Sequence, residues 1–182
     1  MALIPYPAVE SLSNENQRIL ESMPLNLVRM LTGLGSLLPS FMEITRLYST
    51  RGVIPPPLRE LVTLRIAHRT EARYVFTQHE SIARAVGVSG EQTAAVLQPL
   101  PSSIFSDAEN AALMLADDLV FNTKAEPAHV LSVETHLGRD ALHELLLVIG
   151  IYLFLARYSE SLQVDLDVGD AGRILDATVR GM

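Results

Sequence analysis

Two ionisable residues, Glu60 and His79, lie inside an apolar helical pattern rather than beside it. On a helix, Glu60 shares a face with Leu64 and Ala67, so its carboxylate is directed towards apolar neighbours. His79 stands in the middle of a second apolar stripe. Away from water a carboxyl group tends to keep its proton and an imidazole tends to lose its own, unless the two face each other. A facing pair can share a proton, which general acid–base catalysis requires.

Both residues also have structural explanations. A negative charge near the start of a helix is favoured by the helix dipole. A lone histidine on an apolar stripe is typical of a core residue whose hydrogen bonds are satisfied. The residue pattern therefore leaves catalysis and structure open for Glu60 and His79.

The elements that must position these residues are predicted to be two helices joined by a short break. Pro57 suits the first turn of a helix that runs to about His68, because proline there sacrifices no hydrogen bond. After a break at 69–71, apolar residues recur at spacings of three and four until Gly87 ends the run. Antiparallel packing of these helices would bring the carboxylate and the imidazole together.

Helical patterns fill most of the remaining chain, and no β-rich region is evident, so we predict an all-α fold. The helix over 106–122 is expected on the outside of the fold, and that over 139–162 in the core. The other expected elements are an extended arm at 1–12, helices at 14–23, 41–48, 89–97 and 127–137, an interrupted helical stretch at 24–38, and an irregular tail at 163–182 with a final turn near 173–179.

Composition restricts the partners. The net charge of −7 and the scattered 14 basic residues argue against nucleic acid and against anionic membrane surfaces. A chain of 182 residues predicts a single domain over 1–182. Hydrophobic residues make up 48% of the chain, which favours a homo-oligomer that covers part of this apolar surface.

The location predicted from the sequence is cytoplasmic. The chain contains no cysteine, which fits a reducing compartment, and its first residues lack the basic leader and apolar stretch of a signal peptide. The most apolar segment, 145–156, has about a dozen residues where a membrane span needs about twenty. We therefore predict no membrane association.

The segment RELVTLRIAHRTEARYVFTQHESIARAVGVS, residues 59–89, resembles the core motif of the carboxymuconolactone decarboxylase family, whose superfamily also holds the AhpD-type alkylhydroperoxidases. In that family the glutamate of the REL segment and the histidine that closes the YxxxxH segment belong to the active site. They correspond to Glu60 and His79, with Tyr74 opening the second segment. The resemblance implies an AhpD-like helical bundle with a central antiparallel helix hairpin, a core motif at 55–98, and trimers, hexamers or dimers.

The redox members of the superfamily carry two cysteines in a CxxC that ends four residues before the histidine. Ala72 and Val75 occupy those positions, so thiol-dependent peroxide reduction is excluded. The remaining resemblance implies cofactor-free proton-transfer chemistry, of decarboxylation, lyase or isomerase type, on a small carboxylated or lactone-like substrate. The alternative is a non-catalytic helical oligomer that binds a small ligand or partner.

Five further residues are candidates for substrate binding. Tyr74 and Gln78 are expected to border the pocket, and the hydroxyl of Tyr152 needs a partner within its apolar helix. Arg65 and Arg73 flank the hairpin, where either can bind a carboxylate through a two-pronged contact. A core tyrosine and solvated arginines are the structural alternatives.

No metal site and no cofactor are predicted. His129, His136 and His143 recur every seven residues, which returns nearly to one helix face, but Gly138 is expected to break the helix between the last two.

Overall fold

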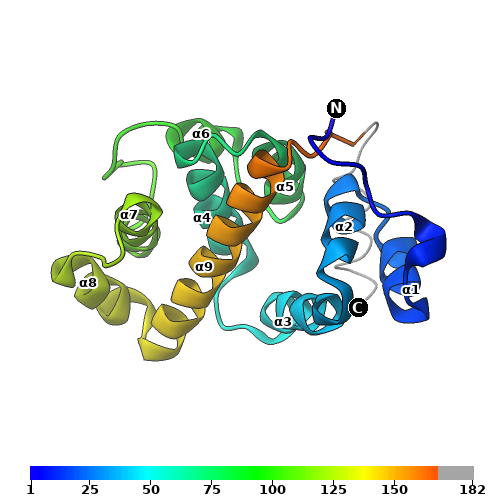
Figure 1. Ribbon diagram of the computed structural model, residues 1–182. Coiled ribbons are helices and arrows are strands. Elements are labelled where there is room, and N and C mark those ends of the chain that lie inside the picture. Colours follow the sequence, from blue (N-terminus) through cyan, green and yellow to red (C-terminus); the bar gives the residue numbers. More distant parts are fainter. Residues whose placement is uncertain (168–182) are drawn as a thin grey trace.

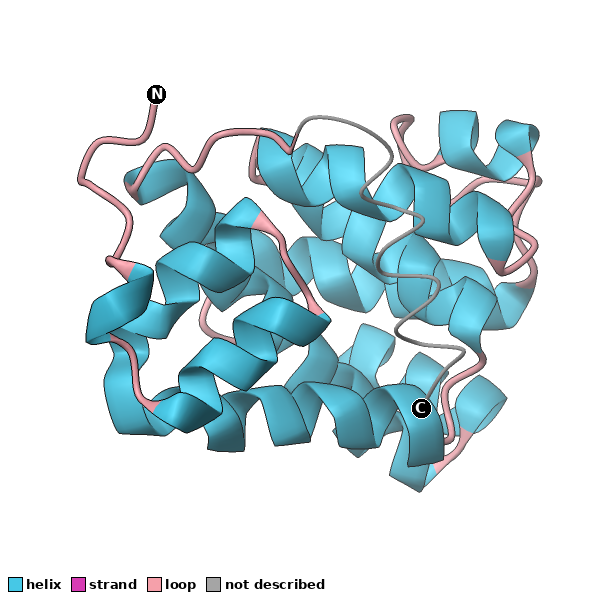
Figure 2. Cartoon of the chain, turned by 90° about the vertical axis from the view of Figure 1, so that its right-hand side faces the viewer, coloured by secondary structure: helices cyan, strands magenta, loops and turns pink. Residues whose placement is uncertain are grey.

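The structure is a computed structural model that describes residues 1–167, and over this range it consists of helices and loops (Figures 1 and 2). The all-α fold is therefore confirmed. The turn expected near 173–179 lies outside the described residues. The elements are a 3₁₀ turn at Val9–Ser11, α1 (Asn14–Ser22), α2 (Asn26–Leu31), a 3₁₀ segment at Thr32–Leu37, α3 (Leu38–Arg51), α4 (Pro56–Arg69), α5 (Arg73–Ala85), α6 (Gly90–Ala95), α7 (Asp107–Phe121), α8 (Pro127–Leu137) and α9 (Arg139–Ser161).

Helix α4 is the centre of the fold. Every residue from Leu58 to Ala67 is buried, as expected for a helix that is covered on all sides. It packs against α5, α7 and α9, and Figure 1 shows α9 with α7 and α8 on one side and α1 to α3 on the other. The expected outer position of the 106–122 helix is wrong, because Leu113, Leu115 and neighbouring alanines of α7 are fully buried against α4.

Helices α4 and α5 form the expected hairpin. Proline occupies the first turn of α4, where no backbone hydrogen bond is lost. Residues 70–72 reverse the chain, and Glu71 has φ of 54°, the left-handed conformation found in tight turns. Ala72 then donates a backbone hydrogen bond to Ala67 across the turn (2.8 Å), which fixes the register of the two helices.

The N-terminal arm is held by the segment that follows α9. Leu3 donates a backbone hydrogen bond to the carbonyl of Leu162 (2.9 Å), and the Asp165 carboxylate accepts from the backbone N–H of Ala2 and from the Tyr6 hydroxyl. The arm is not extended throughout, because the 3₁₀ turn at Val9–Ser11 interrupts it. The two ends of the described chain thus lie side by side.

Two helical stretches, Asn26–Arg51 and Arg139–Ser161, are long and apolar enough to cross a membrane by length and composition alone. The first is broken at Gly35, where φ is 59° and ψ is −125°. The second is α9, whose inner face packs against α4, α5, α7 and α8. The same length and composition occur in core helices. The absence of membrane association stays a prediction.

Candidate active site

Glu60 and His79 meet across the α4–α5 hairpin. The Nδ1 atom of His79 lies 2.7 Å from the Oε2 atom of Glu60, which is 3% exposed. The pairing follows from register, because the tight turn at 70–72 sets Glu60 and His79 opposite each other on facing sides of the helices. The pairing expected from the sequence therefore forms.

The Glu60 carboxylate also fixes the orientation of the imidazole. A carboxylate accepts hydrogen bonds and does not donate them, so Nδ1 carries the hydrogen of the His79–Glu60 contact. Within residues 1–167, no group forms a hydrogen bond with Nε2 of His79. The ring meets Tyr152 edge-on, with centroids 5.0 Å apart and an interplanar angle of 90°. The second nitrogen is thereby available for proton transfer with a bound molecule.

Arg59 lies on the other side of Glu60. Its Nε atom is 3.7 Å from the Oε1 atom of Glu60, and the residue is only 5% exposed. The guanidinium carbon lies 5.8 Å from the ring centroid of Tyr48, a favourable position for a cation over an aromatic face. One buried carboxylate therefore has an imidazole at one oxygen and a guanidinium at the other.

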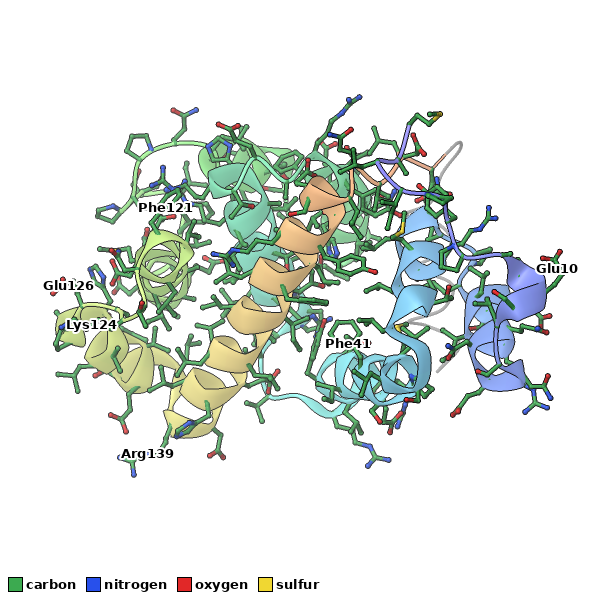
Figure 3. All side chains as sticks on the ribbon, in the orientation of Figure 1. Glu10, Phe41, Phe121, Lys124, Glu126 and Arg139 are labelled. Carbon is green, nitrogen blue, oxygen red and sulfur yellow. The ribbon has the colours of Figure 1, made fainter. Side chains whose placement is uncertain are left out.

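These residues line a cavity of about 590 Å³, within the range of small-molecule sites. His79, Glu60 and Arg59 lie on it together with the phenols of Tyr48 and Tyr152. Exposed residues of α1 and α3 line the part that reaches solvent. The apolar walls come mainly from α2, α3, α5 and α9. Phe41 on α3 (Figure 3) packs against Phe154 on α9, with ring centroids 5.5 Å apart. The apolar wall residues include Leu25, Leu27, Val28, Leu31, Phe41, Met42, Val75, Ile82 and Val86.

The tyrosines of the cavity stay protonated. Burial raises the pKa of Tyr48 and raises the pKa of Tyr152 well above the usual value. Burial and the adjacent Asp167 carboxylate likewise raise the pKa of Tyr74. Neutral phenols are hydrogen-bond donors, so Tyr48 and Tyr152 can stabilise an anion formed in the cavity.

Three of the five predicted binding residues lie on the cavity: Tyr74, Gln78 and Tyr152. Two of these are already engaged elsewhere. The Tyr74 hydroxyl donates to the Asp167 carboxylate and accepts from the backbone N–H of Leu27, and Gln78 donates to the same carboxylate (3.2 Å). Tyr74 and Gln78 thus connect α5 to the segment after α9.

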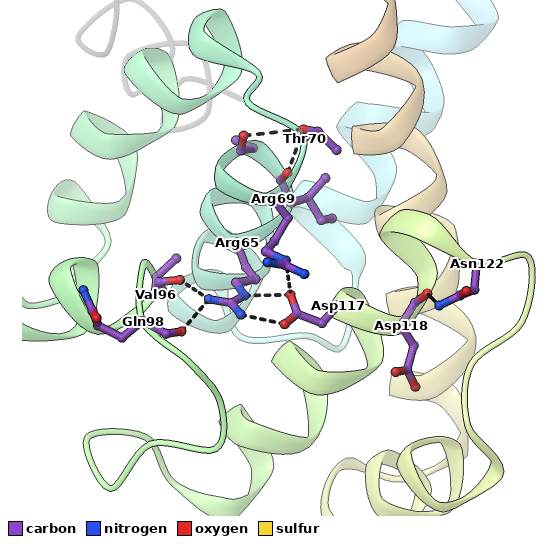
Figure 4. A network of polar contacts seen from close by, with 10 residues as sticks. Arg65, Arg69, Thr70, Val96, Gln98, Asp117, Asp118 and Asn122 are labelled. Atoms are coloured by element: carbon purple, nitrogen blue, oxygen red, sulfur yellow. Dashed lines mark hydrogen bonds and ion pairs between the residues drawn. The ribbon is translucent and has the colours of Figure 1, made fainter.

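The prediction that Arg65 or Arg73 binds a substrate carboxylate is wrong. Arg65 is buried on the side of α4 away from the cavity, where it forms a two-pronged contact with Asp117 and donates to the backbone carbonyls of Val96 and Gln98 (Figure 4). Arg73 is exposed at the start of α5 and does not line the cavity. The carboxylate that Arg65 binds is thus the side chain of Asp117 on α7, whereas a substrate carboxylate was expected.

Sequence reasoning missed Arg59 and Tyr48. Arg59 is adjacent to Glu60 in the sequence, and neighbouring residues on a helix ordinarily point in different directions. Tyr48 belongs to α3, and nothing in its own segment indicates which helix it faces. A signal for Arg59 was nevertheless present, because an arginine within an apolar run needs either an acidic partner or a polar cavity.

A second pair of the same chemistry lies elsewhere. The Nδ1 atom of His129 on α8 is 2.7 Å from the Oδ2 atom of Asp118 on α7, and both side chains are more exposed than those of His79 and Glu60. His129 and Asp118 do not line the cavity. A histidine–carboxylate contact alone therefore does not distinguish the two sites; the cavity does.

Comparison with known proteins gives a match to one family over part of the chain and a similarity in fold. Residues 38–118, from the start of α3 into α7, match the model of the carboxymuconolactone decarboxylase family, and this range contains Arg59, Glu60 and His79. A comparison with curated proteins gives no match.

Three solved structures are similar in fold. The debrominase Bmp8 without ligand has a TM-score of 0.71 at 18% identity, covering 98% of this chain and 96% of its own. A cysteine-to-alanine variant of the same debrominase, in complex with 2,3,4-tribromopyrrole, has a TM-score of 0.70 at 17% identity, covering 98% and 100%. An Agrobacterium tumefaciens protein of unknown function, named for the antioxidant defence protein AhpD, has a TM-score of 0.64 at 16% identity, covering 71% and 92%.

Residues 38–118 therefore match the carboxymuconolactone decarboxylase family, and the described fold is similar to those of the debrominase and of the AhpD-named protein.

Proposed function

We propose that this protein is a cofactor-free enzyme that transfers a proton to or from a small carboxylated or lactone-like organic molecule. The observation that carries the proposal is the geometry of His79, whose Nδ1 atom is held by the buried Glu60 carboxylate while its ring lines a cavity of ligand size. His79 is the proposed acid–base group. Glu60 is a positioning residue that sets the tautomer and orientation of the imidazole.

In a decarboxylation, the bond between the carboxyl carbon and its neighbour breaks, and its electron pair moves into an adjacent carbonyl to give an enolate. Carbon dioxide leaves, and protonated His79 then delivers its Nε2 proton to the enolate carbon. Solvent returns a proton to the imidazole. The phenols of Tyr48 and Tyr152 are donors that can stabilise the enolate oxygen. An isomerisation uses the same base and acid without loss of carbon dioxide.

The similarity in fold to the debrominase supports a small organic molecule as the ligand. That protein was crystallised with a small organic ring, 2,3,4-tribromopyrrole, in a fold similar to this one. The present chain contains no cysteine, so thiol chemistry is not part of the proposal.

Exchange of carbon-bound hydrogen in deuterated water tests the chemistry directly. Acetoacetate, 3-oxohexanoate and a carboxymethyl butenolide are incubated with the protein, and proton NMR follows deuterium incorporation and loss of carbon dioxide relative to buffer. We expect acceleration for at least one compound, with His79→Gln and Glu60→Gln each lowering the enzymatic rate by about 10²-fold or more. His129→Gln is the matched control and retains the rate.

Rates equal to buffer for every compound would contradict the enzyme assignment. Saturable binding without any exchange would instead support the second candidate, a non-catalytic helical oligomer that binds a small ligand. Full activity of His79→Gln would remove that residue from the mechanism.

We also propose a cytoplasmic homo-oligomer, a dimer, trimer or hexamer. Large apolar side chains such as Phe121 (67% exposed), Leu147 (47%) and Phe154 (37%) are uncovered in the single chain, which supports self-association. Light scattering at two concentrations measures the assembly, and a monomer at both would contradict this.

A further inference from the structure

Arg59 and Arg65 are two buried arginines of one helix with opposite surroundings. Arg65 is 3% exposed, and its guanidinium donates to both oxygens of Asp117 and to two backbone carbonyls. Arg59 is 5% exposed, and within residues 1–167 its guanidinium has no hydrogen bond. Its contact with Glu60, at 3.7 Å, is an ion pair that is too long to be a hydrogen bond.

A guanidinium carries five N–H donors, and burying them without acceptors is costly. Arg59 lies on the cavity, so a molecule held there can supply an acceptor. Among the carboxylates on the cavity, Glu60 accepts from His79, both oxygens of Glu43 accept from Arg46 (2.7 and 2.6 Å), and Glu15 is an exposed residue of α1. Water that enters the cavity can accept from these donors in the free protein, and a bound anion with two oxygens can replace that water.

The surroundings restrict what that molecule is. A planar guanidinium matches a carboxylate in a two-pronged contact. The negative charge of Glu60 beside Arg59 favours a monoanion over a phosphate dianion, because two negative groups near one cation repel each other. The surface of the cavity walls is mostly apolar, so the body of the ligand is apolar.

We infer that Arg59 anchors the carboxylate of an organic monocarboxylate with an apolar body. Glu60 contacts Arg59 through one oxygen and His79 through the other, so it holds the anchor and the acid–base group on either side of itself. A carboxylate bound at Arg59 then lies in the same cavity as the imidazole. This assignment names the ligand class of the proposed active site. Binding at Arg59 does not depend on the proposed function, whereas the reaction that follows binding does.

Titration of the full chain with three matched probes, followed by calorimetry or ligand NMR, tests the anchor. Hexanoate is compared with neutral hexanamide and with hexyl phosphate. We expect hexanoate to bind at least about tenfold more tightly than either, which corresponds to about 1.4 kcal/mol. Arg59→Met abolishes this preference, Arg59→Lys retains part of it, and Arg73→Met, at an exposed position outside the cavity, leaves it unchanged.

His79→Gln separates binding from chemistry. It removes the proposed acid–base group and is expected to keep the preference for hexanoate, so the anchor is supported even if no reaction is found. Equal affinity of wild type for hexanoate and hexanamide would overturn the inference, as would a preference that persists in a folded Arg59→Met. Tighter binding of hexyl phosphate would overturn the monocarboxylate class. If Arg59→Met does not fold, the wild-type comparison and Arg59→Lys decide.

Discussion

Two histidine–carboxylate pairs within residues 1–167 allow a controlled measurement of what burial does to the candidate site. Glu60–His79 and Asp118–His129 have the same 2.7 Å contact through Nδ1. Their environments differ, because the side chains are 4% and 14% exposed in the first pair and 18% and 26% in the second. Glu60→Gln and Asp118→Asn are therefore the same chemical change in two environments.

Glu60→Gln is expected to cost much more stability. The amide oxygen still accepts from His79, but the charge beside Arg59 is lost, and removing one partner of a buried ion pair costs roughly 3–5 kcal/mol. Because Arg59 also borders the cavity, where water can reach it, we expect about 2–3 kcal/mol. For Asp118→Asn the amide oxygen can accept from both His129 and the backbone N–H of Glu126, and a more exposed pair contributes up to about 1 kcal/mol.

Urea unfolding followed by circular dichroism at the helix band measures the difference. With a slope of about 2 kcal/mol per molar urea, Glu60→Gln lowers the midpoint by roughly 1–1.5 M and Asp118→Asn by at most roughly 0.5 M. Unchanged slopes are the control that both variants unfold from the same native state. Equal midpoints for the two variants would refute the reasoning, because burial of the Glu60 pair would then have no energetic consequence.

Two further predictions concern groups outside the proposed chemistry. Arg65→Met leaves two backbone carbonyls without their donor and leaves Asp117 with only its 3.4 Å ion pair to Arg69. We therefore expect a loss of about 3 kcal/mol and a drop in Tm of roughly 6–12 °C in a thermal melt, with hexanoate binding of the folded variant unchanged. Loss of that binding would show that Arg65 contributes to the site. Burial raises the pKa of Tyr48, Tyr74 and Tyr152, so these phenols keep their protons in the folded chain while the unfolded chain releases them near pH 10. The unfolded state then binds fewer protons, so stability falls as pH rises above about 10; an ultraviolet titration that shows all tyrosines ionised in folded protein near pH 10 would contradict this.

Local sequence signals predicted the helices well. Ser13, Ser89 and Ser106 each cap a helix through the side-chain oxygen, and the last two form capping boxes with Gln92 and Glu109. Two predictions about helices were wrong: α3 spans Leu38–Arg51 where 41–48 was expected, and α7 is buried where an outer helix was expected. Alanine and leucine on several faces of α7 fit an outer helix and an inner one alike, and only packing against α4 separates them.

The sequence by itself predicted that Glu60 and His79 lie on two consecutive helices whose antiparallel packing would bring them together, and its lack of cysteine excludes thiol chemistry. Helix periodicity and a tight turn are local properties, and together they fix which residues of one hairpin can meet. Tertiary structure decided which arginine serves the cavity. Arg59, Arg65 and Arg73 all lie on that hairpin, but α1 to α3 enclose the first within the cavity, α7 supplies a carboxylate to the second, and the third is exposed. A helix specifies the direction of each side chain, whereas the partner in that direction comes from segments distant in the chain.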